Sequence, residues 1–320
     1  MNATANVADR PVKVSVVIPV FNQQRYLGAC LDTVVNQTLR DIEILCVDDG
    51  STDGSGAILD EAARRDDRIQ VIHQVNAGPG PARNAALDRA RGDYICFMDP
   101  DDRYPAADVL ERLYTSVHGS GCQVAGGFAR CFPYDDPVAV SRDRKGLKFC
   151  AFPRFGIVEF REYQVAVRFW CYIYARDLIA RHRFLALLFV EDMPFFVEVM
   201  RDAGRFLALD VCTYEYRQHS GNNSRVMSPE RIRDRFAAYR RLFDVAVEAD
   251  YQSLCLTIVG STLAWRRRCR IGVFRFAFLI GVSRLPLFTR MYIKYKIARK
   301  RRMKDEQAGD VAPCGAEQGA

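Results

Sequence analysis

The sequence lacks paired cysteines, since none of its eleven cysteines stands in a Cys-x-x-Cys pair. This absence argues against a structural zinc site and against a regular disulfide framework. The first twenty residues also lack a basic start followed by a long apolar stretch, so we expect no signal peptide. Without export, cysteines in apolar runs, such as Cys46 and Cys96, should be reduced thiols in a cytoplasmic protein.

Acidic residues are missing between Ala264 and Lys304, where fourteen lysines and arginines occur. The whole chain has a net charge of +7, so the remaining residues together carry −7. Arg275 and Arg284 interrupt the apolar residues of this region, which therefore fall short of the ~20 that a spanning helix needs. We expect residues 264–304 to bind an anionic membrane surface; a helical subdomain with a solvated basic face is the alternative. No recognised module accompanies the charge, so we expect no nucleic-acid binding.

The chain does contain a regular alternation of strand-like and helix-like segments up to residue 128. Short apolar runs rich in β-branched residues alternate with stretches whose apolar residues have helical spacing. This pattern predicts an α/β fold with a mostly parallel sheet flanked by helices. The expected strands are residues 14–20, 42–47, 69–74, 94–98 and 122–128.

The pattern is weaker beyond residue 128. We expect an irregular connection over residues 131–165, partial helix over 166–185, a helix over 189–204, a strand over 205–217 and a helix over 228–249. Residues 236–304 should form a helical, basic extension, and residues 305–320 a disordered tail. Residues 1–12 are expected to be an N-terminal tail.

Polar residues follow several of the predicted strands at the point where each strand ends. Asp48 and Asp49 end the second strand, and Asn22 and Asn76 follow the first and third; Asp99, Pro100, Asp101 and Asp102 follow the fourth. Because ligands of such sheets bind at the carboxyl ends of the strands, these side chains should converge on one rim.

The acids at 99–102 allow two interpretations. Two carboxylates near one point are ligands for a hard divalent cation, which often keeps substrate phosphates as its other ligands. A solvated acidic turn is the alternative. The second acid pair on the same rim favours a metal at Asp99 and Asp101.

Four other candidate site residues also allow both a structural and a functional interpretation. Asp48 and Asp49 are turn formers or acceptors for a nucleoside. Arg83 is a structural arginine or a ligand for phosphate. Asp192 is a first-turn acid of a helix, which position alone favours, or a catalytic base.

The segments "VSVVIPVFNQQ", "CVDDGSTDGS", "NAGPGPARNAALDRARGDYICFMDPDD" and "ED" at 191–192 resemble glycosyltransferase family 2. The resemblance covers residues 13–128 closely and 185–225 more weakly. It implies a GT-A fold, a nucleotide-diphospho-sugar donor and inversion at the anomeric carbon. Residues 13–235 would be the transferase domain, with a nucleotide-sugar half at 13–128 and an acceptor half at 129–235.

The resemblance also implies site residues. The base pocket would be lined by Pro19, Val20, Phe21, which replaces the usual tyrosine, and Asn22. Asp48 and Asp49 would lie near the nucleoside, and Asn76, Gly78 and Arg83 around the donor. Asp99, Pro100 and Asp101 match the D-x-D motif, whose acids serve the ribose, the metal and the diphosphate. Asp192 would be the base, and the loop with Arg217, His219 and Ser224 would close over the diphosphate.

We therefore predict a transferase that uses Mg²⁺ or Mn²⁺ and moves one sugar from a nucleotide-diphospho-sugar, with a UDP-sugar as the expected donor, to a hydroxyl of a glycan or lipid-linked glycan acceptor. Surface polysaccharide or glycolipid synthesis at the inner face of the cell membrane is the expected setting. The Q-x-x-R-W motif of processive synthases is missing. A non-catalytic GT-A-like binding protein is the alternative, and the acids at 99, 101 and 192 argue against it. A nucleotidyltransferase would need a Gly-rich, basic first loop, which "PVFNQQ" is not.

Overall fold

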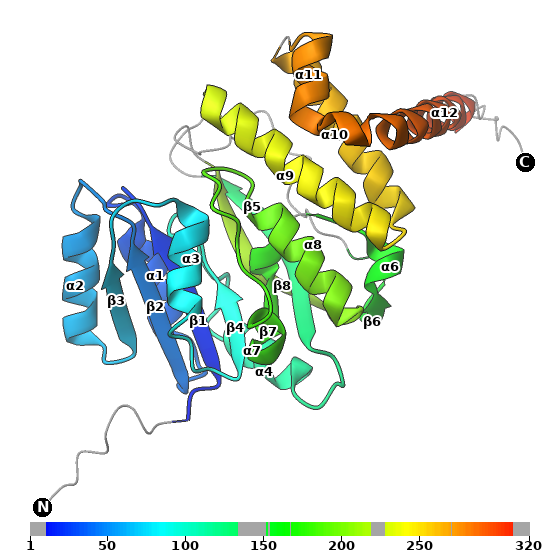
Figure 1. Cartoon of the computed structure of the whole chain (residues 1–320). Helices are drawn as coiled ribbons and strands as arrows, with labels where there is room; N and C mark the ends of the chain where they lie inside the picture. The colour runs from blue at the N-terminus through cyan, green and yellow to red at the C-terminus, as the bar shows by residue number, and fades with distance from the viewer. Residues whose placement is uncertain are drawn as a thin grey trace, which may run out of the picture. The chain divides into compact units, whose positions relative to one another are not determined.

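A computed structural model of the chain describes residues 11–133, 152, 154–166, 168–218, 228–269 and 271–309 (Figure 1). The contacts divide the chain into two compact units, residues 1–238 and 239–320, and the division falls inside helix α9. The domain boundary that we predicted at 235–236 stays a prediction.

The first unit is built around an eight-stranded sheet with the strand order β3-β2-β1-β4-β7-β5-β8-β6. Strands β1 to β4 are parallel to one another, β7 is antiparallel to both of its neighbours, and β6 is antiparallel to β8. The strands are β1 Val14–Val20, β2 Ile42–Asp48, β3 Ile69–His73, β4 Tyr94–Phe97, β5 Val124–Pro133, β6 Gly156–Glu159, β7 Tyr172–Ala175 and β8 Arg205–Gln218.

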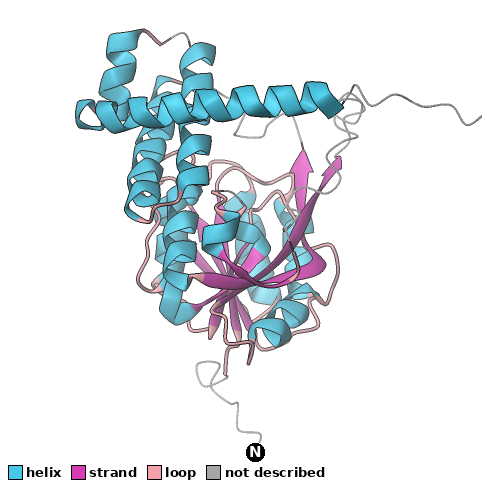
Figure 2. Ribbon diagram, turned by 90° about the vertical axis from the view of Figure 1, so that its right-hand side faces the viewer, coloured by secondary structure: helices cyan, strands magenta, loops and turns pink. Residues whose placement is uncertain are grey.

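Helices pack on both faces of this sheet (Figure 2). Those of the first unit are α1 Leu27–Val35, α2 Ser55–Arg65, α3 Pro79–Leu87, α4 Val109–Val117, α6 Phe160–Tyr163, α7 Arg176–Ile179, α8 Asp192–Ala203 and the start of α9 Pro229–Glu248, with a 3-10 turn, η2, at Phe169–Cys171. The predicted α/β class, with a mostly parallel sheet flanked by helices, is confirmed.

The strand order switches at β1, because β2 and β3 lie on one side of this strand and β4 lies on the other. Strand β1 pairs with β2 along its whole length, but its pairing with β4 stops at Val17 and Phe97. Pro19 therefore has no ladder partner on the β4 side, which suits a residue without an amide hydrogen. A crevice at this position is where open α/β sheets bind ligands.

One predicted element differs from the structure. Residues 166–185 contain η2 and the short helix α7, but residues Tyr172–Ala175 form strand β7 in the middle of the sheet, between β4 and β5. Four residues are too few to reveal a strand by periodicity, so the pairing with two neighbours decides the conformation.

The second unit contains the rest of α9 and the helices α10 Gln252–Arg268, α11 Val273–Ile280 and α12 Leu285–Gly309, with a 3-10 turn, η4, at Val282–Arg284. Helix α12 continues past residue 305, where we expected disorder to begin. Its last residues before Gly309 are good helix formers with no proline or glycine among them, so the helix propagates to that glycine.

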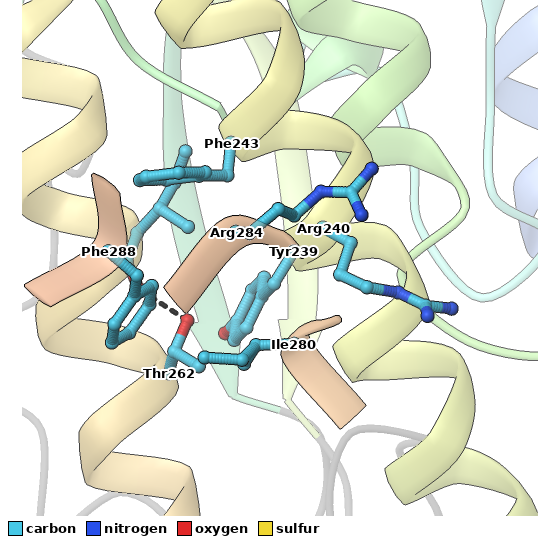
Figure 3. Close-up of a pocket in the computed structure, with 8 residues that line it drawn as sticks. Tyr239, Arg240, Phe243, Thr262, Ile280, Arg284 and Phe288 are labelled. Carbon is cyan, nitrogen blue, oxygen red and sulfur yellow. Dashed lines mark hydrogen bonds between the residues drawn. The ribbon is translucent and has the colours of Figure 1, made fainter. Parts of the chain in front are cut away.

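An apolar pocket lies inside the second unit, with Phe243, Ile258, Ile280 and Phe288 among its lining residues (Figure 3). Arg284 belongs to the same pocket and forms two 2.6 Å hydrogen bonds with the carboxylate of Asp244. Among the helices of the described ranges, none is long and apolar enough to cross a bilayer.

Candidate active site

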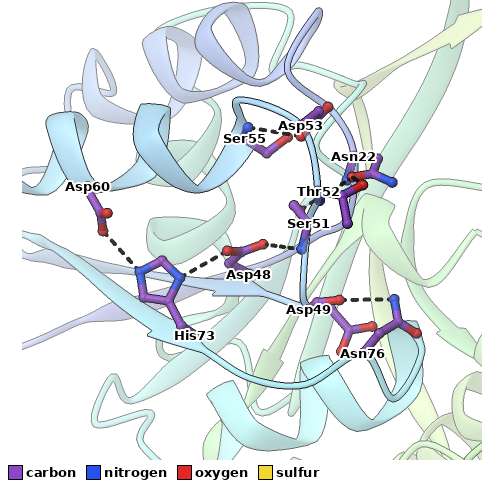
Figure 4. A network of polar contacts seen from close by, with 10 residues as sticks. All are labelled: Asn22, Asp48, Asp49, Ser51, Thr52, Asp53, Ser55, Asp60, His73 and Asn76. Atoms are coloured by element: carbon purple, nitrogen blue, oxygen red, sulfur yellow. Dashed lines mark hydrogen bonds and ion pairs between the residues drawn. The ribbon is translucent and has the colours of Figure 1, made fainter.

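The turn that follows β2 is tied to the loop after β1 (Figure 4). Asn22 has a left-handed backbone with φ of 52°, a conformation that asparagine tolerates. Its side-chain oxygen accepts a 2.8 Å hydrogen bond from the backbone amide of Thr52, and its backbone amide donates to Ser51 Oγ at 3.1 Å. The two loops are therefore tied together as one wall at this edge of the sheet, and Phe21 beside Asn22 is 45% exposed.

Asp48 is the centre of a second set of contacts in this wall. Its carboxylate accepts from the amide of Ser51 at 3.0 Å and lies 2.9 Å from Nδ1 of His73, whose Nε2 lies 3.0 Å from Asp60 (Figure 4). Burial opposes the charge of Asp48, but the hydrogen bonds from Ser51 and His73 lower its pKa. Asp48 and then Asp60 raise the pKa of His73. Sequence reasoning missed His73, whose only signal is its place at a strand end.

Asp49 is buried and shapes the loop that leads into α3. Its two carboxylate oxygens accept from the amides of Ala77 and Gly78, both at 2.8 Å, and from Gln74 Nε2 at 2.7 Å. Asn76 donates to the backbone oxygen of Asp49 at 2.9 Å. The predicted residues Asp49, Asn76 and Gly78 are therefore neighbours, and both carboxylate oxygens of Asp49 are engaged by the loop between β3 and α3.

Arg83 in α3 joins the acidic corner after β4 to the start of α8. Its guanidinium donates to Asp99 Oδ1 at 2.8 Å and to Glu191 Oε1 at 2.5 Å, and only 5% of the residue is exposed. The rings of Phe169 and Phe184 lie 4.9 and 5.3 Å from the guanidinium carbon. Its Nε has no hydrogen-bond partner among the residues that the structure describes. Sequence reasoning named Arg83 but missed Glu191.

The charges around Arg83 change its own titration and that of Asp99. Burial opposes the positive charge, but Asp99, Glu191 and Asp192 more than offset this and raise the pKa of Arg83. Burial also raises the pKa of Asp99, although Arg83 opposes that rise. The arginine thus stabilises a concentration of negative charge that burial alone would not permit.

Asp102 serves the fold and not the open rim. It is fully buried, and it accepts from Tyr214 Oη and from the amide of Arg217, both at 2.7 Å. Burial and then the neighbouring acids raise its pKa well above the ordinary value. Arg217 Nε in turn donates to the backbone oxygen of Asp101 at 2.6 Å, which links β8 to the acidic corner. Pro100 between the two acids is buried.

Asp192 is the first residue of α8 and directly follows Glu191. Burial, followed by the negative charge of Glu191, raises the pKa of Asp192 to about 7, while Arg83 opposes this rise. A carboxylate with a pKa near neutrality is suited to general base catalysis. Val190 just before the pair has a φ of 59°, which costs a β-branched residue about 1–3 kcal/mol. Such strain is typical of functional sites.

The donor set of the corner fits a divalent cation that also binds substrate. No group of three or more acids, histidines or cysteines suited to a metal occurs among the described ranges. Two carboxylates, Asp99 and Asp101, flank Pro100, and Mg²⁺ in proteins is commonly held by one or two carboxylates plus substrate phosphates. These two residues would hold the ion only together with a diphosphate. His219 and Ser224, which we predicted in the later loop, lie outside the described residues.

The model of the family described as "Glycosyl transferase family 2" matches residues 15–183, which include the rim residues from Pro19 to Asp101. The chain belongs to glycosyltransferase family 2. The resemblance inferred from the sequence motifs is thereby confirmed. Asp192 lies outside the matched range, and its role stays a prediction.

The curated proteins that are similar to this chain include named glycosyltransferases. An uncharacterized glycosyltransferase, EpsJ of Bacillus subtilis, is 35% identical over 214 residues, which cover 64% of this chain and 61% of EpsJ. The chain therefore spans less than two thirds of that relative's length. A poly(ribitol-phosphate) beta-glucosyltransferase of Bacillus spizizenii is 44% identical over 107 residues, or 32% of this chain and 17% of that protein.

Solved structures show the same fold. The structure of S. aureus TarS residues 1–349 in complex with UDP-GlcNAc superposes with a TM-score of 0.63 at 20% identity, covering 89% of this chain and 80% of TarS 1–349. At this identity the likeness concerns the fold, which is the GT-A arrangement expected for family 2.

Proposed function

We propose that the protein is an inverting glycosyltransferase that moves one sugar from a nucleotide-diphospho-sugar, with UDP as the nucleotide, to a hydroxyl of a glycan or lipid-linked glycan acceptor. The observation that carries the proposal is the position of Arg83, which holds Asp99 of the acidic corner and Glu191 beside Asp192 on one guanidinium. The base and the corner that would receive the leaving group are thereby fixed relative to each other. Membership of the family and the UDP-GlcNAc complex of TarS support the choice of donor.

In the proposed mechanism, the nucleoside lies against the wall formed by residues 19–22 and 48–53. The acceptor hydroxyl gives its proton to the carboxylate of Asp192 as its oxygen attacks the anomeric carbon from the face opposite the diphosphate, and the configuration inverts. Asp99 and Asp101 would hold Mg²⁺ or Mn²⁺, which when bound would neutralise charge on the leaving diphosphate. Arg217 braces the corner through Asp101, and Asp102 braces it through Tyr214.

Donor binding should depend on the metal, and metal binding should depend on the donor. Because the corner offers only two carboxylates, we expect Mn²⁺ alone to bind weakly and UDP with Mn²⁺ to bind at least about tenfold more tightly than UDP with EDTA. Asp101→Asn should remove most of this difference. Isothermal titration calorimetry measures all three affinities, with Asp67→Asn, an acid from the α2–β3 turn, as the control. Equal UDP affinity with and without Mn²⁺ would remove the metal from the proposal.

We also propose that residues 264–304 hold the protein at an anionic membrane surface, at the inner face of the cell membrane. In α12, Phe288 and Met291 are buried within the second unit. The other side of the helix exposes apolar and cationic residues together: Leu287, Arg290, Ile293, Lys294, Lys296 and Ile297. Such a face lets apolar side chains enter the bilayer edge while cations meet anionic headgroups.

Replacing both isoleucines of that face should weaken membrane binding. Burying one isoleucine contributes about 1.5–3 kcal/mol, so Ile293→Gln with Ile297→Gln should lower partitioning onto anionic vesicles by at least about tenfold. Vesicle flotation at two salt concentrations measures the effect, and Val75→Gln, at a highly exposed position of the first unit, is the matched control. Flotation of the double variant equal to that of the wild type would contradict a membrane role for α12.

A further inference from the structure

The segment before α8 is apolar at the surface. Residues 184–190 read FLALLFV, and only Phe184 among them is buried. Leu185 is 37% exposed and Leu188 is 50% exposed. We call residues 185–190 the leucine loop. A run of exposed apolar residues is unfavourable in water, and it is typical of a surface that binds something.

The leucine loop is held in its exposed conformation by specific contacts. Directly before the loop, the side chain of Asn84 forms two hydrogen bonds with the backbone of Phe184. It donates to the Phe184 oxygen at 2.9 Å and accepts from the Phe184 amide at 3.0 Å. In the middle of the loop, the amide of Leu188 donates to Asp234 Oδ2 at 2.8 Å. At its end, Val190 has the left-handed φ described above. These contacts fix the backbone of the loop, so the leucines are exposed in one defined conformation.

The same loop borders the residues that would bind the donor. A Cβ on Gly80 would lie 2.4 Å from the oxygen of Leu185, so only glycine permits this approach of α3 to the loop. A Cβ on Gly78 would lie 3.4 Å from a methyl group of Leu188. The loop ends directly before Glu191 and Asp192. The exposed leucines thus lie beside the donor loop, a few residues before the proposed base in the chain.

We infer that the leucine loop binds the apolar aglycone of the acceptor, such as an acyl or polyprenyl chain. This inference rests on the proposed function. An acceptor hydroxyl must come within hydrogen-bond reach of Asp192, so the remainder of the acceptor must extend over the surface next to it. On the side of the preceding loop, this surface presents the exposed side chains of Leu185 and Leu188, which offer no hydrogen bonds to sugar hydroxyls but bury methylene groups favourably. The ring of Phe189 in the same loop packs against Arg235 of α9. The acceptor class is therefore lipid-linked sugars rather than free glycans.

The test is a methyl NMR titration of the full chain with ¹³C-methyl-labelled leucine. The probes are octyl β-D-glucoside, kept below its micelle-forming concentration, and methyl β-D-glucoside. We expect the methyl signals of Leu185 and Leu188 to shift saturably with the octyl compound, and its dissociation constant to be at least about tenfold lower than that of the methyl compound, or 1.4 kcal/mol. Leu188→Gln should weaken octyl glucoside binding at least about fivefold. Val247→Gln, which removes an exposed aliphatic side chain of α9, is the control and should leave it unchanged.

Several results would overturn the inference. One is the absence of shifts at Leu185 and Leu188; another is equal weakening by Leu188→Gln and Val247→Gln, which would mean non-specific adsorption. Shifts that occur only with anionic lipid nanodiscs would assign the loop to the bilayer, and shifts that depend on protein concentration alone would assign it to a second copy of the chain. Calorimetry of UDP with Mn²⁺ on the same samples reports the proposed function separately, so its failure would not be mistaken for failure of the loop.

Discussion

Asp192→Asn should lower sugar transfer by about 10²–10⁴ while leaving the affinity for UDP with Mn²⁺ unchanged. The substitution keeps the shape of the side chain but removes the proton acceptor, and general base assistance is typically worth that factor. The uncharged amide also relieves repulsion with Glu191, so the fold should not suffer. Turnover is measured by release of UDP and by transfer to acceptor, and affinity by calorimetry. Turnover near the wild-type rate would exclude Asp192 as the base.

The wild-type pH profile gives an independent check on the same residue. A base must be deprotonated to act, and the pKa of Asp192 is about 7, raised first by burial and then by Glu191. We therefore expect kcat/KM to fall tenfold per pH unit as the pH drops below about 7 and to level off above it. Glu191→Gln removes a neighbouring negative charge, so it should lower the pKa of Asp192 and move the midpoint to a lower pH. A profile that is flat between pH 5 and 8 would contradict this assignment.

Arg83→Met should destabilise the first unit by about 3–5 kcal/mol. The methionine fills the space between Phe169 and Phe184, but it leaves the carboxylates of Asp99 and Glu191 close together without a counter-charge. Removing one partner of a buried ion pair typically has a cost of this size. Asp99 also belongs to the proposed metal site, so donor affinity should fall together with stability.

Urea unfolding measures the change in the free energy of unfolding, and a single tryptophan reporter restricts the measurement to the first unit. The chain has two tryptophans, so a Trp265→Phe background leaves Trp170 of the first unit as the only tryptophan reporter. Arg64→Met is the matched control, because Arg64 pairs with Glu61 on the exposed surface of α2 at 2.5 Å. Surface pairs are worth about 0–1 kcal/mol. Equal unfolding midpoints for Arg83→Met and Arg64→Met would show that the buried pair adds nothing measurable.

The early strands and the rim were predictable because their signals are local. Val14–Val20 and Ile42–Asp48 are short apolar runs whose every residue is buried, and the polar residues that end parallel strands must reach one edge. β7 was not predictable, because a four-residue segment acquires its strand conformation from β4 and β5 on either side. The same holds for Asp102, which looked like part of an open acidic turn. Burial against Tyr214 and the amide of Arg217 was decided by β8, more than a hundred residues away.

The sequence by itself determined the family, the α/β class and the candidate residues at the ends of β1 to β4, because motif and strand-end position are properties of neighbouring residues. The tertiary structure decided which partners those residues bind. The carboxylate of Asp49 accepts hydrogen bonds from the amides of Ala77 and Gly78, and Arg83 pairs with Glu191, which is 108 residues away in the sequence. Such pairings depend on which segments the sheet brings together, and a buried charge takes whatever opposite charge the fold places beside it.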